Sequence, residues 1–389
     1  PQDAEQNIPG FISRGLDHAD LLIARIPSPT LLVATVNDFF SIHGARETAR
    51  EVKQVYRLFG AEGNFSMVED MGIHSSTCKN REGKYAFFQK HLHNPGNCED
   101  EETETLTAEE LRVTPTGQVV TSYGSGTVYD LNRETARQLQ EKLRKSRQDP
   151  VKHREKVLRE ARVLSGYRNS ESPVKAVYAG KIIADSRVTD KYYIQGEGDY
   201  PVPFWLIFPK TPARDQLVIY LHPKGKSQAL KEDSIFSSLL DRGYTILAPD
   251  LLGTGETGPG VYRGDSYING VSYNLFFGSV LLGRSISGIR AGDINRLVSW
   301  AVGYLAPQQI YCIANGYTAP EALHAALFNT RIDRLALIHP FSSFRAVVME
   351  EYYRSDYVHS LVPAALTAYD LPDLAAAFAP REPVSYTHL

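Results

Sequence analysis

Two side chains suited to proton transfer each follow a short apolar run early in the sequence. Asp38 comes after the β-branched run TLLVATV, and His74 follows the next such run within NFSMVEDMGIHSST, with one helical pattern between them. In a serine hydrolase a carboxylate holds the Nδ1 proton of a histidine, so that Nε2 can take a proton from the nucleophile and return it. Taken singly, Asp38 reads as a helix cap or turn residue and His74 as a loop histidine. Their order as a pair favours the acid and base of a catalytic triad.

A second region of the sequence predicts the turn that would carry a nucleophile. In serine hydrolases the serine stands in a strained turn between a buried strand and a helix. The stretch YCIANGYTAPEALHAALF has this pattern, but Gly316 stands at the turn and has no Oγ. Upstream, LVIYLHPKGK stands where an oxyanion loop would lie, with His222 and Gly225 in it. This second region is therefore expected to lack a nucleophile.

Other serines fit the nucleophile position less well. Ser227 in GKSQA follows a strand two positions too early in the expected strand order. Ser285 and Ser287 belong to a helical pattern, in which they are expected to start a helix. His324 lies on an apolar helix face, as a buried core histidine does.

The glycine-rich stretches and the histidine cluster do not predict a cofactor or a metal. GTGETG, residues 253–258, matches GxGxxG after a strand, but a Pro-Gly pair follows where a helix must start. YLHPKGKS ends like a phosphate-binding loop, yet Tyr220 occupies the position of its first glycine. His91, His93 and Cys98 lack a fourth ligand at suitable spacing.

The composition predicts a globular protein without a nucleic-acid or membrane partner. Of 389 residues 42% are hydrophobic and 22% charged, and the net charge of -3 offers no concentrated basic face. No apolar run approaches the roughly 20 residues of a membrane-spanning helix. A Cys78–Cys98 bridge is possible, but three scattered cysteines make no disulfide framework. The first residue is Pro1 and no signal segment follows it, so localisation is not readable from the residues directly.

The elements that must position these residues fall into two expected units and a connector. Residues 1–92 alternate strand and helix signals, which indicates α/β architecture. Residues 93–172 are polar and charged and read as a partly helical linker, with a hairpin candidate in QVVTSYGSGTVYDL. Residues 173–382 hold antiparallel strand signals followed by buried runs separated by helices. This pattern predicts a mostly parallel, doubly wound sheet with its chemistry at the carboxyl ends of the strands.

Long segments of the sequence resemble a known group of enzymes. DFFSIHGARETAREVKQVYRLFGAEGN and HSSTCKNREGKYAFFQKHL resemble the acid-and-histidine end of acetyl xylan esterase or cephalosporin-C deacetylase-like α/β-hydrolases, which are related to dienelactone hydrolase. HPKGK, APDLLGTGETGPG, GRSISGIRAGDINRL and YDLPDLAAAFAPR resemble a second module carried in tandem by some of those proteins. The resemblance covers nearly the whole chain apart from the charged connector.

The resemblance implies an esterase that acts on plant polysaccharides. It implies a serine mechanism that removes acetyl or similar groups, with Asp38 as acid and His74 as base, in a secreted or periplasmic protein. An acylated polysaccharide or oligosaccharide is the implied substrate. In this fold the serine precedes the acid and the histidine, so the serine that belongs to this pair is expected upstream of Pro1.

The same resemblance predicts a fragment cut at both ends. Residues 1–92 would be the C-terminal part of one α/β-hydrolase module, and 173–382 a second module that lacks its last strands. Residues 383–389, PVSYTHL, resemble a tail of non-native origin. Two alternatives remain open: a non-catalytic scaffold or carbohydrate-binding module, and a serine peptidase of the prolyl oligopeptidase type, which shares the sheet and the triad.

Overall fold

The computed structural model describes residues 7–169, 173–184, 187–211, 215–258, 260, 267–381 and 383–386. The chain forms two compact units: an N-terminal unit, Gln2–Ser125, and a C-terminal unit, Gly126–Val261 with Ser266–Leu389. In the described ranges, none of the helices combines the length and the apolar character of a membrane span. Cys78, Cys98 and Cys312 are free thiols, so Cys78 and Cys98 form no bridge.

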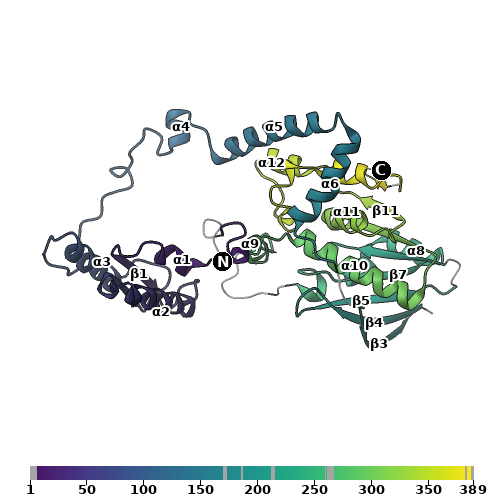
Figure 1. The fold of residues 1–389 in the computed structure, drawn as a ribbon, viewed down its shortest axis with the longest axis horizontal. Helices are drawn as coiled ribbons and strands as arrows, with labels where there is room; N and C mark the ends of the chain where they lie inside the picture. Colours follow the sequence, from purple (N-terminus) through teal and green to yellow (C-terminus); the bar gives the residue numbers. More distant parts are fainter. Residues whose placement is uncertain are drawn as a thin grey trace. The chain divides into compact units, whose positions relative to one another are not determined.

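The N-terminal unit is a strand-helix-strand-helix structure, as the sequence predicts (Figure 1). Its elements are α1 (His18–Ile23), β1 (Thr30–Thr35), α2 (Ile42–Leu58), β2 (Phe65–Asp70), α3 (Cys78–His91) and α4 (Val119–Tyr123). β1 and β2 are parallel, with Thr30 opposite Phe65 and Thr35 opposite Asp70. The carboxyl ends of the two strands therefore lie side by side.

A small core fixes these strands to their helices. Val52 and Tyr56 of α2 are fully buried, and they pack with Phe65 and with alanines of α1 and α2. The Tyr56 hydroxyl donates to the carbonyl of Ser28 at 2.9 Å, just before β1 begins. The apolar face of α2 thus positions both strand ends.

The C-terminal unit is larger and contains the main sheet. Its elements are α5 (Val128–Ser146), α6 (Pro150–Ser165), β3 (Ala176–Ala184), β4 (Arg187–Gln195), β5 (Pro201–Phe208), β6 (Gln216–Leu221), α7 (Lys226–Glu232), α8 (Ser234–Asp241), β7 (Thr245–Pro249), β8 (Tyr267–Ile268), β9 (Val271–Ser272), α9 (Tyr273–Leu281), α10 (Ile286–Leu305), β10 (Gln309–Asn315), α11 (Ala319–Phe328), β11 (Arg334–Ile338), α12 (Phe344–Met349), α13 (Leu371–Ala377) and β12 (Pro383–Tyr386).

The main sheet has the order β12-β11-β10-β6-β7-β5-β4-β3. The pairs from β12 to β7 are parallel, and those from β7 through β5 and β4 to β3 are antiparallel. Helices cover both faces, so β6 is buried on both sides: Leu217 and Ile219 face the larger core, and Val218 and Tyr220 the smaller one. This agrees with the predicted doubly wound sheet, in which buried parallel strands read as continuous apolar runs.

Two expectations for the connector are wrong. The hairpin candidate is helical instead: it contains α4 and the start of α5, where Thr127 and Asp130 form a capping box. The helices α5 and α6 belong to the C-terminal unit, and Val157 and Ala161 of α6 are fully buried in the larger core. Their charged outer faces give them the charge pattern of a solvated linker, although one stripe of α6 is apolar.

The expectation that the second module lacks its last strands is wrong for one strand, and the non-native origin of the tail remains a prediction. Residues 383–386, which we expected in a non-native tail, form β12 and pair in parallel with β11, so that Leu335 lies opposite Pro383. The strand beside β11 that the sequence was expected to lack is therefore present. The rest of the expected tail, residues 387–389, lies outside the described residues.

Candidate functional site

The structure brings Asp38 and His74 together at the carboxyl ends of β1 and β2. His74 Nδ1 lies 2.9 Å from Asp38 Oδ2 and 3.2 Å from Asp38 Oδ1. Each residue follows its strand, and the parallel pairing of the strands places the two loops next to each other. The predicted contact is present, and the catalytic roles of the two residues remain predictions.

Asp38 is held by groups that favour its ionised form. The Thr35 hydroxyl donates to Oδ2 at 3.0 Å, and the Phe40 backbone N–H donates to Oδ1 at 3.0 Å. Partial burial by itself raises the pKa of Asp38, but the hydrogen bonds from Phe40, His74 and Thr35 outweigh it and hold this pKa below its ordinary value. The rings of Phe39 and Phe40 lie 4.6 Å and 5.9 Å from the His74 ring.

This arrangement suits a general base. The Asp38 side chain is only 12% exposed, whereas that of His74 is 61% exposed. With the Nδ1 proton held by the carboxylate, Nε2 is the nitrogen that can accept a proton from a hydroxyl. The Asp38 carboxylate orients the His74 ring, and its negative charge would stabilise the imidazolium that forms when Nε2 takes a proton.

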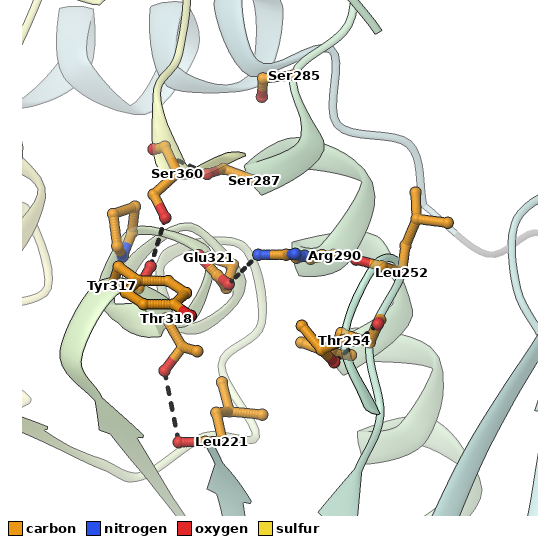
Figure 2. Close-up of polar contacts among 12 residues, drawn as sticks. Leu221, Leu252, Thr254, Ser285, Ser287, Arg290, Tyr317, Thr318, Glu321 and Ser360 are labelled. Atoms are coloured by element: carbon orange, nitrogen blue, oxygen red, sulfur yellow. Dashed lines mark hydrogen bonds and ion pairs between the residues drawn. The ribbon is translucent and has the colours of Figure 1, made fainter. Parts of the chain in front are cut away.

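The turn after β10 has the predicted strand-turn-helix form. β10 ends at Asn315, Gly316 has a φ of +59°, and α11 begins at Ala319. A Cβ atom added at Gly316 would meet only Pro223 Cγ, at 3.9 Å, so there is space for a side chain. The Ser360 hydroxyl donates to the Tyr317 carbonyl at 2.5 Å, which ties the turn to a distant loop (Figure 2).

A buried ion pair lies beside this turn. Arg290 Nη1 of α10 is 3.0 Å from Glu321 Oε1 of α11, and both side chains are at most 1% exposed (Figure 2). Arg290 Nε donates to the carbonyl of Leu252 at 2.9 Å. Burial raises the pKa of Glu321, and the Arg290 charge opposes that rise. The pair joins two helices to the loop that follows β7, and no pattern in the sequence signals it.

The other serine and histidine candidates have structural partners. The Ser285 hydroxyl donates to the Ser165 carbonyl at 3.0 Å and caps α10, and the Ser287 hydroxyl donates to the Ser360 carbonyl at 3.0 Å. His324 is fully buried between the Pro320 carbonyl and the Tyr369 hydroxyl. Its full burial confirms a core histidine, and this burial lowers the pKa of His324 to about 4. Ser227 is exposed in the first turn of α7.

The predicted oxyanion loop follows β6, where Gly225 has a packing role. A Cβ at Gly225 would lie 2.4 Å from Asp250 Oδ1 and 2.7 Å from Gly255 Cα, so the close approach of two loops requires glycine. His222 Nδ1 accepts from the Lys224 N–H at 3.2 Å. Burial lowers the pKa of His222, while the nearby charge of Asp233 opposes this. An oxyanion role for this loop remains a prediction.

Sequence reasoning missed a Ser-His-Asp arrangement in the C-terminal unit. Ser146 Oγ lies 2.9 Å from His153 Nδ1, and His153 Nε2 lies 3.0 Å from Asp373 Oδ1. Arg147 also binds both carboxylate oxygens at 2.7 Å. Because Ser146 ends α5, where helix carbonyls concentrate negative charge, this is a poor place to stabilise an oxyanion. We interpret the Ser146, His153 and Asp373 contacts as structural hydrogen bonds that hold α5, α6 and α13 together.

Among the residues that the structure describes, no cluster of three or more His, Cys, Asp or Glu side chains could hold a metal ion. His91, His93 and Cys98 accordingly form no such cluster.

Comparison with known proteins gives structural relatives only. No family model matches the sequence, and no curated protein matches it either. A putative acetyl xylan esterase from Bacteroides fragilis is similar with a TM-score of 0.50 and 13% identity, over 70% of this chain and 76% of that chain.

Two further structures are similar at lower scores. An acetyl xylan esterase from Paenibacillus sp. R4 has a TM-score of 0.37 and 15% identity, over 59% of this chain and 76% of that one. A glucuronoyl esterase from Teredinibacter turnerae has a TM-score of 0.38 and 12% identity, over 59% and 65%. At such identities the likeness concerns the fold. The chain has the α/β-hydrolase fold of the Bacteroides fragilis protein that it resembles.

Proposed function

We propose that this chain carries the acid and the base of a serine-type carbohydrate esterase, with Asp38 and His74 in these roles. The observation that carries the proposal is the hydrogen bond of 2.9 Å between them, at the adjacent ends of two parallel strands. The α/β-hydrolase fold supports it, because this fold places its acid and histidine after successive strands. Acylated polysaccharides or oligosaccharides are the proposed substrates, and a secreted or periplasmic protein the proposed context.

The proposed reaction uses a serine that precedes Asp38 and His74 in the chain order of this fold. His74 Nε2 would take the proton of that serine as its Oγ attacks the ester carbonyl, and would then return the proton to the leaving alcohol. Asp38 would hold the imidazole orientation and stabilise its positive charge. Loss of the nucleophile of a triad costs a factor of about 10⁶ in kcat, so this chain alone is expected to be nearly inactive.

The test uses a longer protein that contains these residues. Asp38→Asn and His74→Gln are each expected to lower kcat on acetylated xylan by about 10³-fold or more, with KM within a few-fold. His43→Gln is the matched control, because His43 is an exposed histidine of the same unit. Equal activity of His74→Gln and His43→Gln would reject the proposed role.

The specificity of the site is tested with the same protein. Hydrolysis is measured on acetylated xylan, on methyl-esterified pectin and on a panel of peptides, which distinguishes an esterase from the alternative of a peptidase. The proposal expects hydrolysis of an ester and none of the peptides. Hydrolysis by this chain alone that disappears in Ser227→Ala would show that its nucleophile had been overlooked.

A second candidate function applies to the C-terminal unit, which we propose is non-catalytic. The supporting observation is Gly316 at the turn after β10, together with Ser285 and Ser287, whose hydroxyls are bound to backbone carbonyls. A hydrolase-like module without a nucleophile can still serve as a scaffold or as a binding surface.

A further inference from the structure

The C-terminal unit contains a cleft of about 660 Å³ whose lining does not include the turn after β10. Residues of β4 and β5 and of the loop between them make up most of its lining. The alternating residues Lys191, Tyr193 and Gln195 of β4 line the cleft, and Tyr192 borders it as well, whereas Ile194 is buried in the larger core. The volume lies within the range of roughly 300–1,000 Å³ that is usual for small-molecule sites.

Aromatic and prolyl side chains form the floor of the cleft. Trp205 lies opposite Lys191 and Pro203 opposite Tyr193 in the register between β4 and β5. Tyr193 is 40% exposed, and Trp205 packs at the margin of the smaller core. The floor thus offers flat apolar surfaces to a ligand.

One wall is the loop from Gln195 to Pro201, which the structure holds in place. The Tyr200 hydroxyl donates to the buried Asp293 at 2.7 Å. A Cβ at Gly196 would lie 2.3 Å from the Tyr200 ring, so only glycine lets the ring lie across the loop. Gly196 N–H donates to the Tyr200 carbonyl at 2.9 Å. The cleft is therefore preformed on this side.

The opposite wall carries Lys226 between two carboxylates, Asp250 and Glu256. Lys226 Nζ lies 2.5 Å from Glu256 Oε1 and 5.4 Å from the centroid of the Trp205 ring, and it also binds Asp250. The Lys226 side chain is 1% exposed and that of Glu256 is 63% exposed, so the carboxylate is the group that a ligand can reach.

The charges of the lining do not favour an ionic ligand. The lining contains two lysines, 191 and 226, and two acids, Asp199 and Glu256, and the buried Asp250 behind Lys226 leaves this lysine with no charge to spare for an anion. A strongly anionic or cationic ligand would meet no complementary field here. Carboxylate, amide and ammonium groups around flat rings instead suit a neutral ligand that has several hydroxyls and apolar C–H faces.

From this arrangement we propose that the cleft binds a neutral oligosaccharide, with a sugar ring stacked on the exposed Tyr193 ring and its hydroxyls bound by Glu256 and Gln195. The inference rests on the proposed non-catalytic role of the C-terminal unit and names its ligand class.

Tryptophan fluorescence offers a local readout of binding. The sequence has two tryptophans: Trp205 lines the cleft, and Trp300 is buried in the core at 8% exposure. Titration of the full chain with xylotetraose, cellotetraose and mannotetraose is expected to give a saturable change for at least one of them. Trp205→Phe is expected to abolish the change.

Calorimetric titration of the same sugars measures the affinity in the variants. Tyr193→Ala is expected to weaken binding at least about tenfold, because stacking on a single aromatic ring contributes on the order of that factor. Tyr352→Ala is the matched control, since Tyr352 is 84% exposed and does not line the cleft. It is expected to bind like the unaltered chain.

Each contrary outcome overturns the inference. One such outcome is that none of the three sugars binds. Another is that Tyr193→Ala binds them as tightly as the unaltered chain does. A third is that the chain selectively binds tetragalacturonate or a proline-rich peptide. His74→Gln separates this result from the proposed catalysis, because it removes the base and leaves the cleft unchanged. If the longer protein binds the sugars but hydrolyses no ester, only the catalytic roles of Asp38 and His74 are rejected. If it hydrolyses an ester but binds none of the sugars, only the proposed oligosaccharide site in the cleft is rejected.

Discussion

At Gly316 the backbone has the form of a nucleophile turn, but the residue carries no reactive side chain. The backbone at this turn has the left-handed φ that a nucleophile position demands, and the space beside it is open. The geometry is retained, while the atom that would react is not there. In the described part of the C-terminal unit, His222, His324 and His359 are each hydrogen-bonded to backbone groups.

Gly316→Ser is expected to fold and to gain no esterase activity, because His222, His324 and His359 are already hydrogen-bonded to other groups. The left-handed φ of +59° is expected to cost about 1 kcal/mol in unfolding free energy. Gly303→Ser is the control, since Gly303 is an exposed residue of α10 with open space beside it. Urea unfolding and hydrolysis of p-nitrophenyl acetate measure the two effects; a clear gain of hydrolysis would contradict the non-catalytic assignment.

Asp293 is a second residue whose environment has a measurable consequence. Burial raises the pKa of Asp293 to about 7, and the negative charge of Glu197 adds to the rise, whereas the Tyr200 hydrogen bond and Arg296 oppose it. The folded state therefore favours the protonated acid. Its contribution to stability is fully present below the ordinary pKa of 3.8 and is lost as the pH rises toward about 7.

Asp293→Asn is expected to flatten the pH dependence of the unfolding free energy between pH 5 and 8 by about 3 kcal/mol, because asparagine does not titrate. The amide oxygen of the new side chain would still offer an acceptor to Tyr200. Asp215→Asn, a change at an exposed aspartate, serves as control. Parallel pH profiles for Asp293→Asn and the unaltered chain would show that Asp293 titrates in its ordinary range.

At the scale of elements, α10 and α11 are joined by a buried charge pair rather than by apolar contacts alone. The pair lies beside the turn after β10 and also binds the loop that follows β7. Burying two charges is costly, so each depends on the other for compensation. Loss of either Arg290 or Glu321 should therefore lower the unfolding free energy strongly.

Arg290→Ala and Glu321→Ala are each expected to lower the unfolding free energy by about 3–5 kcal/mol, since each leaves a buried charge without its partner. Replacing both residues by apolar ones should cost less than the sum of the two changes. Arg354→Ala breaks the exposed pair with Asp356 and should cost less than about 1 kcal/mol. Urea unfolding is the measurement, and equal losses for Glu321→Ala and Arg354→Ala would contradict the argument.

At the scale of the molecule, each unit has its own hydrophobic core. Val52 is fully buried in the core of the N-terminal unit, and Phe236 in the smaller core of the C-terminal unit. A unit with its own core is able to unfold as its own cooperative transition.

Two thermal transitions are expected in calorimetry of the full chain. Val52→Ala should lower one of them and Phe236→Ala the other, since each change removes buried contacts from one core only, at a cost of about 2–5 kcal/mol. A single transition lowered by both variants would show that the two units unfold as one.

Local patterns in the sequence were enough to predict the strands of the fold. Buried runs such as QLVIYL and QIYCIA became β6 and β10, because parallel strands covered on both faces carry continuous apolar residues. The same patterns predicted that Asp38 and His74 would meet, since residues that follow adjacent parallel strands lie at one edge of a sheet. The missing Oγ at Gly316 needs no structure to recognise.

Features that depend on packing between distant segments required the folded chain. The charge pattern of α5 and α6 is that of a linker, and the burial of Val157 became evident only in contact with the main sheet. Asp373 is 220 residues away from His153, so their contact leaves no local pattern. The cleft beside Tyr193 likewise combines β4, β5 and the segments that follow β6 and β7. A sequence records local periodicity and turn chemistry, whereas these contacts arise from the way whole elements fill space against one another.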